Sequence, residues 1–240
     1  MKKLLLILLC LPMIGFGQLT YVPDDNFEQA LINLNYDNIL DNYVNTSNID
    51  NISSLYLPQA NIYDLTGIED FISLDHLTIY LNQLTSLDIS QNTELTFLNC
   101  SGNLLTTLDV SQNSNLTHLY CGGWPTVPGQ LTSLITAGAY SLEIIDCSDN
   151  QLNNIDVSQN LVLTDLYCSS NQLTSLDVSN NTALGGLGCS FNQLTSLNTS
   201  GADSLHSLYC FNNELTSLDV SQNISLVWLA CYNNNLIDLN

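Results

Sequence analysis

The sequence predicts a repeat solenoid that is mostly β, with short strands on both sides, weak curvature and a small helical cap at its N-terminus. The first observation is a cysteine that recurs every 21 residues with one gap of 26, at Cys100, Cys121, Cys147, Cys168, Cys189, Cys210 and Cys231. The text between these cysteines is nearly constant, and a fixed period of this length is typical of stacked repeats. Both halves of the unit alternate apolar and polar residues, which is the period of a strand. Because the two halves are of nearly equal length, we expect little curvature.

Residues 1–17 are the first element, a predicted secretory signal peptide. Lys2 and Lys3 precede an apolar run over residues 4–11, and the small residues Gly15 and Gly17 follow. This is the pattern of a cleavable export signal. The apolar run is too short to span a bilayer, so no membrane insertion is expected. We therefore predict a secreted or cell-surface protein.

The charge of the remaining chain is strongly one-sided. Both basic residues lie in the predicted signal, so residues 18–240 carry 23 acidic side chains and neither Lys nor Arg. Nucleic acid is excluded as a partner because no side chain of fixed positive charge can neutralise its phosphates. Binding to anionic lipid is excluded on the same ground. The acidic charge can still serve to bind a basic protein partner, to bind cations, or simply to keep the protein soluble.

Residues 18–51 do not follow the period and form a predicted N-terminal cap. Asp25 and Glu28 have the spacing of a capping box, and Phe27, Leu31 and Leu34 follow at helical spacing. A short helix here would cover the open end of the solenoid, as the terminal units of repeat proteins must do.

The rest of the cap, residues 36–48, is rich in Asn and Asp and is predicted to be a loop. Asp37 and Asp41 are candidate calcium ligands, but they lack the ligand spacing of a recognised calcium loop. We expect a surface turn there and leave weak calcium binding open.

Residues 52–240 form the repeat array of about nine rungs, the last of which is incomplete. The rungs begin at Ile52, Leu74, Leu95, Leu116, Leu142, Leu163, Leu184, Leu205 and Leu226. An insertion at residues 122–130 reads GGWPTVPGQ and places Trp124 where other rungs have Asn. This insertion forms either a recognition lip at the sheet edge or a neutral extension of a surface loop.

One segment of each rung carries a family resemblance. Its motif is L-x-x-L-x-C-x-x-N-x-L, as in the segment from Leu95 to Leu105. This motif resembles the leucine-rich repeat, and the 21-residue unit resembles the bacterial nested class called IRREKO. The first rung, which ends in DLTGIEDF, resembles an internalin repeat. The resemblance implies an exported bacterial leucine-rich repeat protein used in protein recognition or adhesion. Such proteins often end in a sorting or anchoring domain, so an array that stops in mid-repeat suggests a truncated gene product.

Residues that recur once per rung are expected to stack into ladders. For the cysteines a disulfide is within reach, but parallel neighbours point the same way and their number is odd, so buried free thiols are expected. Asparagine is expected to satisfy buried turn backbone. The main asparagine ladder consists of Asn103, Asn150, Asn171, Asn192 and Asn213.

A second repeated position is acidic. Aspartates a strand spacing apart repel one another, so either a cation lies among them or water screens them, and we favour screening. This aspartate column consists of Asp88, Asp109, Asp156, Asp177 and Asp219.

Aromatic residues gather at or beside the outward positions of the cysteine half. They suit contacts with a protein partner or stacking on sugar rings, although β propensity alone would also favour them there. The candidate partner-binding residues are Tyr56, Tyr80, Phe97, His118, Tyr120, Trp124, Tyr167, Tyr209, Phe211, Trp228 and Tyr232. A protein partner is the first expectation, and a glycan-binding or architectural matrix role is the alternative.

The inventory for catalysis is small. Only His76, His118 and His206 titrate near neutrality by default. His76 and His118 are expected to lie two rungs apart, or about 10 Å, which is too far for one proton relay. The sequence contains no C-x-x-C pair of the kind that would indicate a zinc site. The sequence therefore predicts a binding protein without enzymatic activity, cofactor or metal centre.

Overall fold

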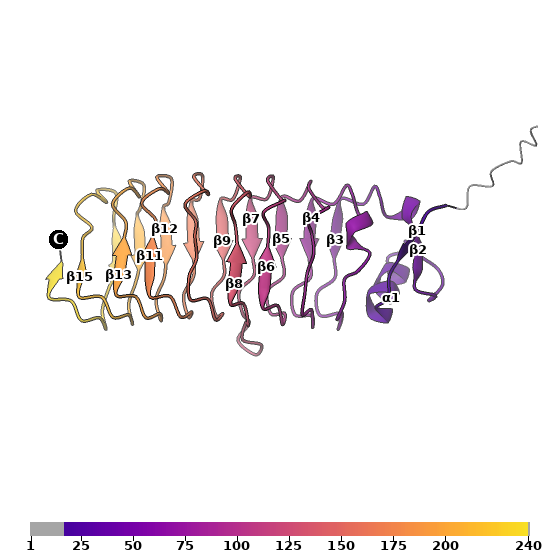
Figure 1. The fold of residues 1–240 in the computed structure, drawn as a ribbon, viewed down its shortest axis with the longest axis horizontal. Coiled ribbons are helices and arrows are strands. Elements are labelled where there is room, and N and C mark those ends of the chain that lie inside the picture. Colours follow the sequence, from indigo (N-terminus) through magenta and orange to yellow (C-terminus); the bar gives the residue numbers. More distant parts are fainter. Residues whose placement is uncertain (1–16, 240) are drawn as a thin grey trace, which may run out of the picture.

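Nine parallel strands, one from each rung, form the main sheet of the solenoid (Figure 1). The computed structural model describes residues 17–239, so nearly all of the predicted signal peptide lies outside the described residues. In chain order the nine strands are β3 (Ser54–Tyr56), β4 (His76–Thr78), β5 (Phe97–Asn99), β7 (His118–Tyr120), β9 (Ile144–Asp146), β10 (Asp165–Tyr167), β12 (Gly186–Gly188), β14 (Ser207–Tyr209) and β16 (Trp228–Ala230).

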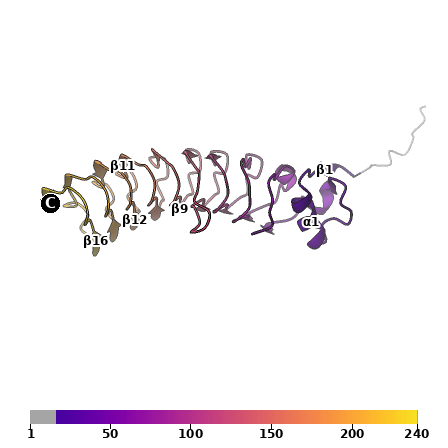
Figure 2. The same cartoon turned by 90° about the horizontal axis from the view of Figure 1, so that it is seen from below.

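A second, interrupted layer of strands lies opposite the main sheet. The view in Figure 2 separates the layers, with β9, β12 and β16 on one side and β11 on the other. The strands of this second layer form three parallel pairs. These pairs are β6 (Thr107–Asp109) with β8 (Ser133–Ile135), β11 (Ser175–Asp177) with β13 (Ser196–Asn198), and β15 (Ser217–Leu218) with β17 (Asp238–Leu239). The prediction of a two-sided β-solenoid is therefore confirmed.

The first rung differs from the others. The 3₁₀ helix η2 (Ile68–Asp70) stands where later rungs carry the second-layer segment. Gly67 precedes it with a φ of 103°, and a Cβ there would press against the backbone oxygen of Tyr21. This rung is thus shaped to receive the cap.

The cap consists of a small antiparallel hairpin and one helix. Strand β1 (Leu19–Tyr21) pairs with β2 (Tyr43–Asn45), helix α1 spans Asp25–Asn33, and the 3₁₀ helix η1 (Thr46–Asn48) follows. Phe27 and Phe71 are both fully buried, and their rings stack 6.3 Å apart, which seals the solenoid end against α1. Among the described residues, no helix is long and apolar enough to cross a membrane.

Two details of the predicted cap are wrong. The helix is capped by Asp24 and not by Asp25, because Asp24 Oδ1 accepts the N–H groups of Asn26 and Phe27, each at 2.9 Å. Glu28 does not close a capping box and instead binds the backbone of the returning loop. The predicted loop 36–48 also contains β2 and η1, whose three-residue lengths leave no periodic signal.

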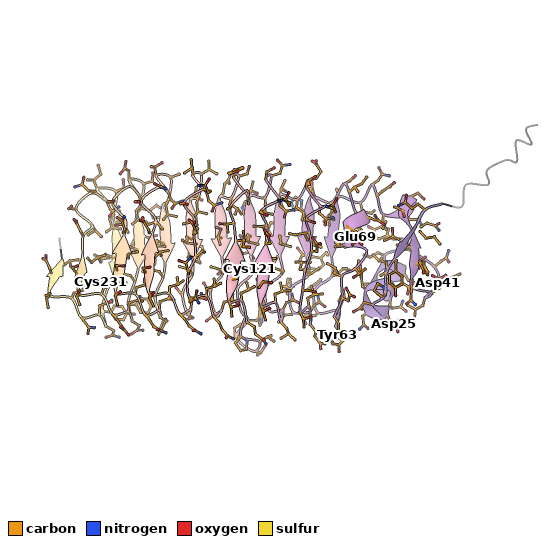
Figure 3. The ribbon with its side chains drawn as sticks, in the orientation of Figure 1. Asp25, Asp41, Tyr63, Glu69, Cys121 and Cys231 are labelled. Atoms are coloured by element: carbon orange, nitrogen blue, oxygen red, sulfur yellow. The ribbon has the colours of Figure 1, made fainter. Side chains whose placement is uncertain are left out.

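The cysteines line the inside of the rungs as free thiols. Six are buried, and Cys231 in the last rung is partly exposed. Figure 3 labels Cys121 near the middle of the solenoid and Cys231 near its C-terminal end. Burial raises the pKa of Cys100 and Cys210 to about 12, and it raises the pKa of Cys121, Cys147, Cys168 and Cys189 well above the usual value. These thiols are neutral, apolar packing groups.

The main asparagine ladder connects each rung to the one before it. Asn171 Nδ2 donates to the carbonyl oxygens of Cys147 and Cys168, at 3.0 and 3.1 Å, while its Oδ1 accepts the N–H of Leu152 at 2.9 Å. Equivalent bonds recur at Asn103, Asn150, Asn192 and Asn213. Each side chain therefore satisfies backbone groups of two adjacent rungs.

A second asparagine ladder is interrupted in two rungs, where a different four-residue motif takes the place of the asparagine. Asn92, Asn113 and Asn181 donate to the preceding rung, but each keeps a buried Oδ1 without a partner. Rungs that have Ala139 or Ala202 in place of this Asn carry the sequences TAGA and TSGA, over residues 136–139 and 199–202.

In these two rungs a threonine and a glycine complete the structure. The hydroxyl groups of Thr136 and Thr199 lie 2.9 and 2.8 Å from Oδ1 of the asparagine one rung later, Asn160 or Asn223. A Cβ at either glycine would collide with the backbone oxygen of a serine in the previous rung. The T-x-G-A tetrad is thus a structural substitute for V-S-x-N, and the half-rung that follows the insertion is intact.

Candidate partner-binding face

The outward side chains of the main sheet lie in continuous rows. In each three-residue strand the central residue points into the core, and the first and third residues point outward. Strand register aligns the third positions as Tyr56, Thr78, Asn99, Tyr120, Asp146, Tyr167, Gly188, Tyr209 and Ala230. We call this surface, with its adjoining loops, the aromatic face.

Four rings form what we call the strand cluster on β4, β5 and β7. Phe97 lies between His76 and His118, with ring centres 5.7 and 6.1 Å apart, and it also contacts Tyr120 at 5.5 Å. His76 is exposed, while Phe97, His118 and Tyr120 are partly buried by one another. The cluster therefore presents a preassembled apolar surface rather than separate flexible rings.

Three further rings, the loop cluster, lie beside the strand ends. The indole of Trp124 stacks on Tyr80 with an interplanar angle of 2° and ring centres 5.6 Å apart. Tyr56 meets Tyr80 edge-on, and their hydroxyl oxygens are 3.1 Å apart. This hydrogen bond is the main reason that the pKa of Tyr80 is raised above its usual value.

The insertion is what delivers Trp124 to the loop cluster. It folds back on itself through paired backbone bonds between Trp124 and Val127, at 2.7 and 2.8 Å. Asn150 reaches back across the insertion to the carbonyl oxygen of Cys121, at 3.0 Å, so the ladder continues although Trp124 occupies the Asn position.

A third group, the C-terminal cluster, contains a residue that sequence reasoning missed. Phe211 stacks on Tyr232 at 4.6 Å, and Phe191 meets Phe211 edge-on at 5.2 Å. Phe191 is 53% exposed and has a left-handed φ of 54°. Its position, two residues after each ladder cysteine, is left-handed in most rungs, so alignment of that column would have marked an outward, strained site.

The remaining predicted residues stand apart from these clusters. Tyr167, Tyr209 and Trp228 are 42%, 43% and 65% exposed, and they make no ring contact within residues 17–239. Gly186 and Gly188 of β12 lie between Tyr167 and Tyr209 in the sheet, and both are buried, with the ring of Tyr167 3.3 Å from where a Cβ at Gly188 would stand. The predicted residues therefore form three clusters and three single rings along the aromatic face.

The central part of the face is acidic. The hydroxyl of Tyr167 donates to Asp165 Oδ1 at 3.2 Å, and Asp146 lies beside Tyr167 in the same row. Burial, followed by these negative charges, raises the pKa of Tyr167. The arrangement can bind apolar groups together with positive charge, because the rings are flanked by carboxylates.

The opposite side of the solenoid carries the aspartate column. Each of these aspartates accepts the N–H of the serine two residues later, as Asp177 does from Ser179 at 2.9 Å. Hydrogen bonds from Ser179 lower the pKa of Asp177. In register, Asp177 faces Asn198, whose Nδ2 donates to it at 3.1 Å, and Asp109 faces Ile135. The carboxylates are thus engaged locally and the column is interrupted.

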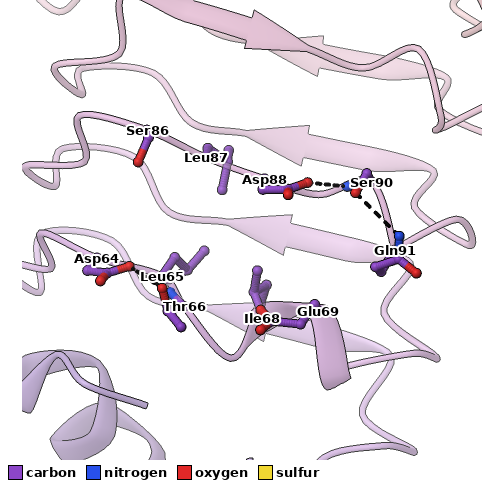
Figure 4. A pocket seen from close by; sticks show the side chains of 10 residues that line it. All are labelled: Asp64, Leu65, Thr66, Ile68, Glu69, Ser86, Leu87, Asp88, Ser90 and Gln91. Atoms are coloured by element: carbon purple, nitrogen blue, oxygen red, sulfur yellow. Dashed lines mark hydrogen bonds between the residues drawn. The ribbon is translucent and has the colours of Figure 1, made fainter. Parts of the chain in front are cut away.

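A polar hollow lies on that opposite side, between the first two rungs. Figure 4 shows Asp64 and Asp88 on its two walls, bonded to Thr66 and Ser90 respectively. Among the residues that the structure describes, no three acidic, His or Cys side chains converge where they could hold a metal ion. The hollow lacks the aromatic rings that distinguish the aromatic face.

Comparison with solved structures places the chain among known solenoids. A functional domain of InlJ from Listeria monocytogenes, described as including a cysteine ladder, is similar with a TM-score of 0.83 and 37% identity over 93% of this chain. The match covers 50% of that structure, so the chain spans about half its length.

Two further structures share the fold. Internalin C2 from Listeria monocytogenes has a TM-score of 0.66 and 21% identity, over 92% of this chain and 95% of its own. The leucine-rich repeat ectodomain of the receptor kinase GASSHO1/SCHENGEN3 from Arabidopsis thaliana, in complex with CASPARIAN STRIP INTEGRITY FACTOR 2, has a TM-score of 0.66 and 22% identity, over 78% and 25%. No protein-family model and no curated protein matches the chain. By its repeat length, its fold and its resemblance to InlJ, the chain is a leucine-rich repeat protein with a solenoid of the internalin type.

Proposed function

We propose that the chain is an exported recognition module that binds a protein partner through the aromatic face, at or near a bacterial cell surface. The leucine-rich repeat neighbours support a protein-interaction module. The observation that carries the proposal is the concentration of rings on one side. Preassembled aromatic clusters lose little side-chain entropy on binding, and Tyr, Trp and Phe are typical of interface hot spots.

The charge of the chain restricts the chemical character expected of the partner. Residues 18–240 contain 23 acidic side chains and no Lys or Arg, and carboxylates border Tyr167. A complementary partner would be basic around an apolar centre. Export rests on the sequence pattern of residues 1–17.

A glycan is the alternative ligand, because the rings of Tyr56 and Trp124 are accessible for stacking on sugar. The two ligands are distinguished by one pair of experiments. We would test glycan-array binding and co-purification of a protein partner with the wild type and with a Tyr56→Ala, Trp124→Ala double variant, which removes two of the three rings of the loop cluster.

The matched control is Tyr140→Ala, because Tyr140 is 60% exposed but lies outside the main sheet. We expect a protein partner to be retained by wild type and Tyr140→Ala, and its affinity to fall by about tenfold or more in the double variant. Glycan signal that disappears in the double variant would instead favour the alternative. Equal protein binding by all three proteins would contradict the role of the aromatic face.

A further inference from the structure

An aspartate stands between two tyrosines near the middle of the aromatic face. Strand register places Asp146 on β9 beside Tyr120 on β7 and beside Tyr167 on β10. Neighbouring strands are about 4.8 Å apart, so the Cα atoms of the two tyrosines are separated by about 10 Å. The rings of Tyr120 and Tyr167 do not contact each other within residues 17–239. A carboxylate therefore lies in a gap that has one aromatic ring on each side.

Both rings are held away from β9 by contacts on their far sides. Tyr120 packs against Phe97 of β5, with ring centres 5.5 Å apart. Tyr167 leans toward β12, where a Cβ at Gly188 would stand 3.3 Å from its ring. The two rings thus incline in opposite directions, and the gap above Asp146 stays open.

The glycines of β12 make this inclination possible. A Cβ at Gly186 would stand 2.5 Å from Asp165 Oδ1, which shows that Asp165 leans over β12 as Tyr167 does. The same Asp165 oxygen accepts the hydroxyl of Tyr167 at 3.2 Å, so the two outward side chains of β10 hold each other in place. Larger side chains at Gly186 and Gly188 would push both back toward β9.

The carboxylate of Asp146 keeps an oxygen available for a ligand. Its side chain is partly exposed, and its Oδ1 accepts the N–H of Ser148 at 3.0 Å. Its Oδ2 accepts no hydrogen bond from the residues that the structure describes. Burial raises the pKa of Tyr167, and the negative charges of Asp165 and Asp146 raise it further, so both carboxylates act on this ring. Residues 18–240 offer no Lys or Arg to balance these charges.

We propose that Tyr120, Asp146 and Tyr167 form a socket for an arginine side chain of the protein partner. This socket rests on the proposed function and specifies the chemical group that this part of the aromatic face takes. A guanidinium group stacks on aromatic rings and donates paired hydrogen bonds to a carboxylate. Stacked at about 3.5–4 Å from each ring, it needs a gap of about 7–8 Å, which the spacing of the two tyrosines provides.

Arginine fits the socket better than the other groups that a partner could insert. A lysine ammonium is a compact, strongly hydrated charge that cannot stack as a plane or bind a carboxylate through a rigid fork. A neutral sugar ring could stack on one tyrosine but would not balance the charges of Asp146 and Asp165. A guanidinium group uses both rings and the carboxylate at once.

Titration with short peptides tests the socket. The probe is an acetylated Gly-Arg-Gly amide, and the matched peptides carry lysine or citrulline in place of arginine, because citrulline keeps the shape of arginine without its charge. Amide NMR signals of β7, β9 and β10 report binding at about 0.15 M salt, where screening weakens general attraction to the acidic surface. We expect saturable binding of the arginine peptide, and affinity about fivefold or more weaker for the other two peptides.

Two pairs of variants locate the binding. Asp146→Asn removes the charge but keeps an oxygen for the N–H of Ser148, and its control is Asp149→Asn, which removes an exposed carboxylate from the same rung. Tyr167→Leu removes one ring, and its control Tyr167→Phe keeps that ring. We expect the arginine peptide to bind about fivefold or more weakly to Asp146→Asn and Tyr167→Leu, and within about twofold of wild type to both controls.

The socket is overturned if the arginine and citrulline peptides bind equally well, or if each variant binds the arginine peptide as its control does. The two pairs change different parts of the socket, so either pair suffices if a variant of the other fails to fold. Co-purification of a partner tests the proposed function separately, through Tyr56 and Trp124 of the loop cluster. Loss of a partner there, without arginine binding here, would support the aromatic face and overturn the socket.

Discussion

Single side chains in this solenoid act by completing backbone hydrogen bonds between rungs. The clearest case is the T-x-G-A tetrad, in which the hydroxyl of Thr136 pairs with the asparagine of the following rung. Its hydroxyl lies 2.9 Å from both Asn160 Oδ1 and the carbonyl oxygen of Asp156. The equivalent residue in a regular rung is Val157, and there Asn181 Oδ1 stays without a partner. Two solutions to one packing problem therefore coexist in the same chain.

Replacing Thr136 by Val should destabilise the protein. The change keeps the side-chain shape but leaves Asn160 Oδ1 buried and unpaired, which costs about 1–2 kcal/mol. The free energy of unfolding from denaturant titration measures this cost. The reciprocal Val157→Thr places a hydroxyl near the unpaired Asn181 Oδ1 and should cost less. Equal losses in both variants would show that the hydroxyl has no specific partner.

For single residues, the sequence shows which positions are structurally important better than it shows which residues they contact. The ladder residues were predictable because each recurs with the period, as Asn171 and Cys168 do. The partnership of Thr136 with Asn160 was not, because the two residues lie 24 positions apart and only the stacking of rungs joins them. Phe191 was missed for a related reason, since its outward direction follows from a left-handed backbone rather than from alternation.

Among the elements, α1 is the one that joins the cap to the array. Asp24 performs both tasks, since Oδ1 caps the helix and Oδ2 accepts the N–H groups of Tyr63 and Asp64 in the first rung, at 2.7 and 3.0 Å. The helix itself was predictable from its apolar spacing, but its cap was not. Two adjacent aspartates satisfy the pattern, and only the contact with the first rung distinguishes Asp24 from Asp25.

Asp24→Ala should therefore loosen the cap while the array stays folded. Loss of four hydrogen bonds to a carboxylate, including the helix cap, is expected to cost about 2–4 kcal/mol. Hydrogen exchange should accelerate at the amides of α1 and at Tyr63, while the amides of β10 and β12 remain protected. Asp25→Ala is the control, because that side chain is exposed. Similar exchange at α1 in both variants would argue against this role of Asp24.

The whole molecule is a one-dimensional stack, and its period made the fold readable from the sequence. Contacts between rungs repeat, so nine strands in one sheet followed from a single 21-residue unit. The non-repeating parts were harder to predict. The β1–β2 hairpin has three residues per strand, and the stacking of Trp124 on Tyr80 depends on how the insertion folds back. The candidate face was predictable as a row of residues, but its division into clusters was not.

The same stacking concentrates six buried thiols in one core, which should make the protein sensitive to high pH. Burial holds the folded-state pKa of Cys100 and Cys210 at about 12 and that of the other four well above the usual value. An unfolded thiol ionises near pH 8.5. Stability from a raised folded-state pKa is complete below the unfolded pKa and is lost as pH rises toward the folded pKa.

Each thiol then lowers the free energy of unfolding by about 1.4 kcal/mol per pH unit above about pH 9, so six thiols lower it by about 8 kcal/mol per unit. A stability of about 10 kcal/mol would be exhausted near pH 10. Denaturant titrations between pH 7 and 10.5, under reducing conditions, measure this slope. Cys168→Ala should reduce the slope by about one sixth although it lowers stability at neutral pH, because one titrating thiol is removed and a small cavity is left. A flat profile to pH 10.5, or a slope that cysteine replacement leaves unchanged, would show that the ladder does not control alkaline unfolding.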